Sequence, residues 1–202
     1  MANINSPRGL IARQHGNGGL ARVSILPYQI AGALASNIYR GSAVIPVNTN
    51  RRIDVAAAGG RVIGAFWGVS FVDGVSLQPM FLPRWPSGQT LVTGTIAEAQ
   101  VFDDPDIIFE CQVSSASGLV ATDVGNFADL VIGTGNALTG NSGDMVDQTT
   151  LTSTIATGGQ VRVEGLSPFS DNEFGQYAKA LVRFNEHFLR GSTTAGQATT
   201  PV

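Results

Sequence analysis

Short apolar runs, separated by turn residues at intervals of roughly 8–12 residues, are the feature that most constrains how this chain can fold. The run at residues 107–113 is typical, because Phe109 and Cys111 alternate with Glu110 and Gln112. Such alternation puts apolar side chains on one face of a strand and polar side chains on the other. The pattern predicts a mainly β chain that forms a compact antiparallel β-barrel or sandwich of the jelly-roll type.

Local signals refine this prediction. Asp73 and Gly74 predict a tight hairpin between strands at residues 61–72 and 75–82, since both residue types tolerate a positive φ. Residues 178–188 favour a last strand, although their apolar spacing also suits a helix. Among the other stretches, we expect a helix at residues 29–39, a glycine-rich surface loop at 133–148, and strands at 149–157 and 160–166.

The surface of this chain is poor in charge. Charged residues make up 13% of the sequence, against about 25% in an average soluble domain. One lysine stands against eleven arginines, and arginine is enriched at protein interfaces while lysine is depleted. These features indicate an assembly protein whose surface is covered by partners. A low-charge monomer held soluble by neutral polar side chains is the alternative.

The charges also divide unevenly along the chain. Residues 1–53 carry six arginines and no acid, hence +6, whereas the remainder carries fifteen acids and six bases, hence −9. Pro7, Gly9 and the turn cluster at residues 16–19 disfavour regular structure in the first twenty residues. We therefore divide the chain into an extended N-terminal arm (1–22), a β domain (23–190) and a flexible C-terminal tail (191–202).

The arm is the predicted protein-binding site. We expect it to lie across a neighbouring subunit or another partner protein, with the guanidinium groups selecting an acidic surface and two aliphatic side chains anchoring it. The residues that we expect to bind are Arg8, Leu10, Ile11, Arg13 and Arg22. A disordered tail is the alternative interpretation. Six arginines spread over 53 residues are too sparse for a nucleic-acid arm, so no direct contact with nucleic acid is expected.

Few residues offer catalytic chemistry. Cys111 is the sole cysteine and lies in an apolar run, which predicts a buried core position and excludes an internal disulfide. The only histidines are His15 and His187. The loop around Ser142 and Asp144 lacks the Gly-x-Ser-x-Gly elbow of serine hydrolases. We therefore expect no enzyme activity and no cofactor.

Two further groups have a structural and a functional interpretation. Asp103, Asp104 and Asp106 offer clustered oxygens for Ca²⁺, but the proline between them favours a plain turn, so no metal site is expected. Trp67 and Trp85 flank the predicted hairpin, where packing is the more frequent role of tryptophan than stacking on bases or sugars.

The lack of targeting signals predicts a protein that is made and kept in a cytosol, or that is released by a route other than secretion. Arg8 and Arg13 interrupt the N-terminal stretch before it reaches the apolar length of a signal peptide. No run approaches the ~18 apolar residues of a membrane span. We therefore expect no membrane contact.

Several short motifs follow one another along the chain: Pro7-Arg8-Gly9-Leu10, Tyr28-Gln29-Ile30-Ala31, Gly64-Ala65-Phe66-Trp67-Gly68-Val69, Arg84-Trp85-Pro86, Val101-Phe102-Asp103-Asp104-Pro105 and Val182-Arg183-Phe184-Asn185-Glu186-His187. Their order and spacing resemble a family of small virion structural proteins from tailed bacteriophages, the capsid cement or decoration proteins. The resemblance spans residues 7–191, and Cys111 departs from it by standing where valine is expected.

This resemblance implies a non-catalytic protein on the outer surface of the capsid, assembled in the host cytoplasm. The implied partners are the major capsid protein and other copies of the chain, as a homotrimer. A head-fiber base, or a receptor- or glycan-binding β module of the virion, is the alternative. Copy number separates the two, because a cement protein is present in far more copies per particle than a fiber component.

Overall fold

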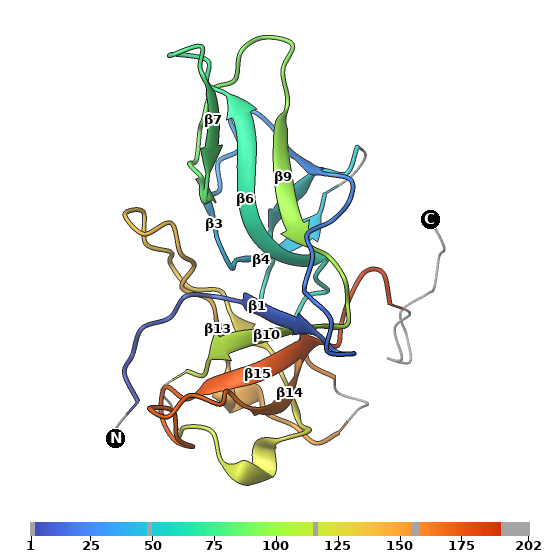
Figure 1. Ribbon diagram of the computed structural model, residues 1–202, viewed down its shortest axis with the longest axis vertical. Coiled ribbons are helices and arrows are strands. Elements are labelled where there is room, and N and C mark those ends of the chain that lie inside the picture. The colour runs from blue at the N-terminus through green and yellow to red at the C-terminus, as the bar shows by residue number, and fades with distance from the viewer. Residues whose placement is uncertain (1–2, 48–49, 115–116, 155–157, 191–202) are drawn as a thin grey trace.

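The computed structural model describes residues 3–47, 50–114, 117–154 and 158–190, and there the chain is mainly β with antiparallel sheets, as predicted. Sheet I has the strand order β1-β10-β15-β14-β11. Its strands are β1 (Ile11–His15), β10 (Ile107–Gln112), β15 (Lys179–Phe184), β14 (Val161–Leu166) and β11 (Phe127–Ala128). The strands of sheet I lie across the long axis of the molecule in Figure 1.

Sheet II has the order β2-β9-β6-β4-β5, and β7 also pairs with β6. Its central strand β6 runs along the long axis in Figure 1. The strands are β2 (Tyr28–Ile30), β9 (Ala97–Phe102), β6 (Gly64–Val72), β4 (Ala43–Pro46), β5 (Ile53–Val55) and β7 (Pro79–Leu82). Two small pairs complete the fold, β3 (Ile38–Tyr39) with β8 (Arg84–Trp85) and β12 (Leu130–Val131) with β13 (Met145–Val146).

Alternating side chains explain sheet I. Phe109 and Cys111 of β10 are buried in an apolar cluster, and Val182 and Phe184 of β15 join them from the neighbouring strand. The predictions of strands at 107–113 and 178–188 are therefore confirmed. Cys111 is a free, buried thiol, as expected.

Sheet II curls around a second apolar cluster that contains Phe66 and the fully buried Trp85. A parallel bridge between Gln29 and Arg52 brings its two edge strands close together. The sheet is not closed into a barrel, so the sandwich-like half of the fold prediction holds and the barrel half does not.

Two separate segments of the chain contribute strands to sheet I. It enters with β1, passes through all of sheet II, and returns with β10 after the turn at residues 103–106. The backbone N–H of Ala43 in sheet II donates to Asp144 Oδ2 over 2.9 Å, and Val62 bridges His187. These contacts join the sheet II segment to the part of the chain that builds sheet I.

The N-terminal arm requires a correction. Residues 11–15 form β1 and pair with β10, and Leu10 is only 3% exposed within the sheet I core. The β body thus begins well before residue 23. The physical reason is that β10 would otherwise expose an unpaired edge, which β1 covers. Gly9 makes the approach feasible, because its φ of +70° and its contact with the Gly41 carbonyl exclude a side chain.

Several loop predictions were also wrong. Residues 29–39 form parts of β2 and β3 joined by turns rather than a helix. The β6–β7 connection spans residues 73–78, and its positive φ falls on Leu77 rather than Gly74. The glycine-rich stretch 133–148 contains β13 and the buried Ser142 and Asp144, so it is not a plain surface loop.

The remaining predicted elements fall partly outside the described residues. The strand expected at 149–157 begins instead as a 3₁₀ turn, η2 (Gln148–Thr150), and its residues 155–157 are not described. The tail at 191–202 also lies outside. A second 3₁₀ turn, η1 (Ala121–Asp123), precedes β11. Within the described ranges, neither turn has the length or apolar character that crossing a membrane requires.

Candidate functional site

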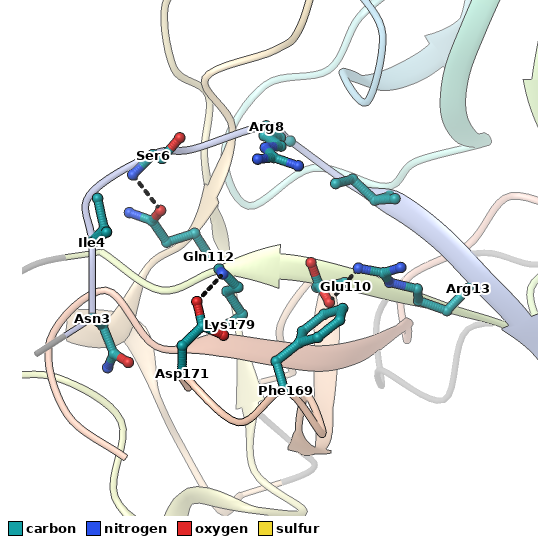
Figure 2. Close-up of a pocket in the computed structure, with 12 residues that line it drawn as sticks. Asn3, Ile4, Ser6, Arg8, Arg13, Glu110, Gln112, Phe169, Asp171 and Lys179 are labelled. Carbon is teal, nitrogen blue, oxygen red and sulfur yellow. Dashed lines mark hydrogen bonds and ion pairs between the residues drawn. The ribbon is translucent and has the colours of Figure 1, made fainter. Parts of the chain in front are cut away.

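The segment before β1 crosses the outer face of sheet I and is tied to the chain's own body (Figure 2). The Asn3 side-chain amide donates to the backbone carbonyls of Glu173 and Gln176 over 2.8 and 2.9 Å. The backbone N–H of Ser6 donates to Gln112 Oε1 over 2.8 Å. Gln112 is available for this bond because the alternation of β10 turns its side chain away from the core.

A groove of about 450 Å³ lies between this segment, β10, β15 and residues 169–171 (Figure 2). Glu110 lies buried at its side, where it accepts from Arg13 Nη2 over 2.7 Å and from Ser167 Oγ over 2.6 Å. Lys179 Nζ lies 4.0 Å from Asp171. Arg8 also lines the groove. The charged lining therefore consists of three cations and two anions and has a formal charge of +1.

The arm residues predicted from the sequence separate into two classes. Leu10 belongs to the chain's own core and Arg13 is paired with Glu110, while Ile11 is half-buried opposite Glu110 in β1. The burial of Leu10 in its own core corrects its assignment as a contact to a neighbour, whereas the assignments of Ile11 and Arg13 stay predictions. Arg8 and Arg22 are exposed, and neither side chain has a hydrogen-bond or ion-pair partner among the described residues.

Two exposed apolar side chains line the same groove as Arg8. Ile4 is 74% exposed and Phe169 is 44% exposed. The Arg13 guanidinium lies 5.1 Å from the centroid of the Phe169 ring, and the Lys179 ammonium lies 5.7 Å from it. We call this surface the arm face and define it by Ile4, Arg8 and Phe169.

A second surface lies on sheet II and was missed by the sequence analysis. A shallow groove crosses β6 between β7 and β9, with Ser70 and Val72 on its floor and Phe81 and Ile96 at its sides. Glu98 is the charged residue of this lining. Its carboxylate is exposed and has no hydrogen-bond or ion-pair partner in the part of the chain that the structure describes. We call this surface the Glu98 groove.

A signal for the Glu98 groove was present in the sequence. In β9, Ala97, Ala99 and Val101 are buried while Glu98 points outward. Phe81 lies close over β6 because residue 68 is glycine, where an added Cβ would meet the ring at 2.5 Å. The alternation predicts the outward carboxylate, but only the strand pairing places Phe81 beside it.

A third exposed surface is the connector between β1 and β2, residues 20–26. Leu20, Ile25 and Leu26 are all more than half exposed, and Ile25 is 99% exposed. The backbone N–H of Ser24 donates to the Val101 carbonyl over 2.7 Å. The connector therefore presents aliphatic side chains and Arg22 from a fixed backbone.

Catalytic interpretations receive no support from the described residues. Ser142 Oγ accepts from Ser42 Oγ over 3.2 Å, and no histidine contacts either hydroxyl. Burial raises the pKa of Asp144 to about 6 and raises the pKa of the Cys111 thiol, so that thiol is not an activated nucleophile. Burial lowers the pKa of His187 to about 4.

The acidic turn builds ion pairs. Asp103 accepts from the Tyr28 hydroxyl over 2.9 Å, and Asp104 lies 3.1 Å from His15 Nε2. His15, Asp104 and Asp106 have ligand atoms within 4.8 Å of one another. Asp106, however, also pairs with Arg190 and lies 3.7 Å from Arg183. Two guanidinium groups at one carboxylate disfavour a cation there.

The tryptophans have packing roles. Trp85 is fully buried and meets Phe71 edge to face, with ring centroids 5.4 Å apart. Trp67 is partly exposed, but the Arg40 guanidinium lies 4.4 Å from its ring centroid. One face of that ring is therefore covered, which does not favour an open platform for bases or sugars.

Comparison with known proteins identifies no relative: no family model, no curated protein and no solved structure matches this chain. The exposed surfaces described above are therefore the basis for a function. These surfaces combine apolar side chains with single charges that lack a partner among the described residues. Such a combination suits contacts with other proteins.

Proposed function

We propose that this chain is a non-catalytic capsid cement protein that binds the outer surface of the major capsid protein shell of a tailed bacteriophage and stabilises the head. The observation that carries the proposal is the presence of separate apolar surfaces on two different sheets, the arm face on sheet I and the Glu98 groove on sheet II. A cement protein has to contact several neighbours at once, so it needs more than one such surface. The low charge content and the order of the sequence motifs support the same role.

The arm face is the surface that we assign to the shell. Its aliphatic and aromatic side chains stabilise a contact when they leave water, by about 1.5–3 kcal/mol for each one fully buried. Arg8 adds selectivity for an acidic patch but little affinity, because exposed ion pairs contribute about 0–1 kcal/mol. The arm residues that stay with the body, Leu10 and Arg13, hold this surface in place.

The test is a variant with Ile4→Ser, Arg8→Ser and Phe169→Ser together. All three side chains are exposed, so the variant should fold. We expect its affinity for purified shells of the cognate capsid protein to fall by at least a factor of about 100, since loss of apolar burial alone exceeds 2.7 kcal/mol. Co-sedimentation with shells over a concentration series measures the change.

The matched control is Leu138→Ser, which removes a 97% exposed side chain outside the arm face. Its affinity for shells should equal that of the unmodified chain. Equal binding by the triple variant and the control would contradict the assignment of the arm face. Absence of binding to shells by the unmodified, folded chain would contradict the cement function itself.

A further inference from the structure

We propose that copies of this chain bind one another head to tail, with residues 20–26 of one copy lying in the Glu98 groove of the next copy. The inference rests on the structural role proposed above and names the surfaces through which the copies associate. It requires one contact type only, between two different surfaces of the same chain.

The Glu98 groove is open in the described part of the chain. Phe81 and Ile96 are each about half exposed at its sides, and it holds about 450 Å³. Glu98 is its single formal charge. A fitting occupant is therefore an extended aliphatic segment with one basic side chain and no acid, since a second carboxylate would be repelled.

The connector at residues 20–26 has this chemistry. Leu20, Ile25 and Leu26 present aliphatic side chains to solvent. Arg22 is the only charged residue of the segment and has no partner among the described residues. A guanidinium and a carboxylate that both lack partners, each flanked by exposed apolar side chains, form a complementary pair of surfaces.

The connector does not occupy the groove of its own copy, because none of residues 20–26 lines it. The Ser24 backbone bond to the Val101 carbonyl holds it beside one end of β9. Ile96 precedes the other end, five residues away, which is roughly 16 Å along an extended strand. The contact must therefore form between copies.

A contact between two different surfaces has a consequence for assembly. Each copy offers one connector and one groove, so the contact repeats around a ring if the rotation closes, and otherwise extends into a filament. The homotrimer expected from the family resemblance is the closed ring of three copies. The arm face is not part of this contact and stays open to the shell.

Charge reversal tests the pairing of Arg22 with Glu98 in purified protein. We expect Arg22→Glu and Glu98→Arg each to shift the sedimentation profile from oligomer to monomer, because each brings like charges together. The double variant Arg22→Glu/Glu98→Arg should recover the oligomer. Arg8→Glu is the matched control: it reverses another exposed arginine without a partner, on the arm face, and should leave the oligomer intact.

Mixing tests the head-to-tail geometry independently. Ile25→Asp damages only the connector, and Ile96→Asp damages only the groove. Each variant alone should be monomeric, whereas a mixture should form one discrete heterodimer through the intact groove of the first and the intact connector of the second. Thermal melts of each variant should match the unmodified chain, because both side chains are exposed.

The outcomes separate this inference from the cement function. A monomeric unmodified chain, or charge variants that keep the oligomer, or a mixture that stays monomeric, would overturn the head-to-tail contact. None of these results concerns binding to shells, which the arm-face variant measures. Conversely, a chain that forms the predicted oligomer but does not bind shells would support the head-to-tail contact and contradict the cement function.

Discussion

At the scale of single residues, Asp144 is the clearest joint between the two sheets. Its carboxylate accepts the backbone N–H groups of Ala43 over 2.9 Å and Gly133 over 3.1 Å, although the side chain is almost fully buried. Burial disfavours the charged form and raises its pKa to about 6. Asp144 thus links the backbone of the sheet II segment to that of residue 133, but burying its charged carboxylate costs free energy of folding.

This cost predicts a pH dependence that Asp144→Asn should remove. The carboxyl binds its proton more tightly in the folded state, so its contribution to stability falls as pH rises from about 4 to about 6. The loss corresponds to about 3 kcal/mol for a shift of about two units. Urea denaturation at pH 4, 5, 6 and 7 should show the unmodified chain losing stability relative to Asp144→Asn across that range.

His187 acts with the opposite sign and makes the comparison informative. Burial lowers its pKa to about 4, so its contribution is present above the unfolded pKa of about 6.5 and is lost as pH falls toward 4. Asp144→Asn removes one carboxyl that opposes this contribution, so between pH 4 and 6.5 the variant should gain stability relative to the unmodified chain. Parallel pH profiles for the two proteins would contradict the role of Asp144. A uniform offset is expected in addition, because asparagine leaves one backbone donor without a carboxylate oxygen.

At the scale of elements, β1 makes the N-terminal segment part of sheet I, so the stability of that sheet depends on it. Leu10→Ala should lower the free energy of unfolding by about 2–5 kcal/mol, because it opens a cavity in the sheet I core. Deleting residues 1–7 removes, among the described residues 3–7, hydrogen bonds at the outer face of sheet I such as that of Ser6, so the fold should survive. Deleting residues 1–20 removes β1 and Leu10 and should unfold sheet I. Circular dichroism with urea titration distinguishes these three results, and a stable body after the longer deletion would restore the picture of a detachable arm.

The elements also show what the sequence predicts and what it does not. Alternation identified β10, β14 and β15, and a run rich in β-forming residues identified β6, because each of these signals lies within one short segment of the sequence. The pairing of β1 with β10 joins segments about a hundred residues apart, and no local pattern encodes it. The same limit explains the error at residues 29–39, where tertiary pairing with β9 overrides a helical preference.

Buried polar residues were the other class that the sequence did not predict. Gln160 is fully buried and bonds four backbone groups, two of them as acceptor from Gly59 and Leu130 and two as donor to Ala57 and Gly60. In the sequence it was only the first residue of a strand. Its role depends on loops that arrive from elsewhere in the chain, so the candidate surfaces resting on such loops required the structure.

At the scale of the whole molecule, the two binding surfaces are well separated. The N-terminal segment and β7 lie toward opposite ends of the long axis (Figure 1), so the arm face can contact a shell while the Glu98 groove holds a neighbouring copy. Linked copies bind a shell through several arm faces at once. Such multivalent attachment makes dissociation far slower than that of a single copy, without any new contact.

Attachment of this kind predicts how particles respond to heat. A protein that binds only the assembled shell stabilises that shell by mass action, with a gain that grows as the logarithm of its concentration over Kd. Particles without the chain should therefore release DNA at a lower temperature than decorated particles, and adding purified chain back should restore the difference. The arm-face variant should fail to restore it, whereas Leu138→Ser should succeed. Dye access to DNA during a temperature ramp measures the release, and identical release temperatures with and without the chain would exclude the cement role.

Monomeric variants with an intact arm face, such as Glu98→Arg, should restore only part of the difference, because they bind through one arm face each.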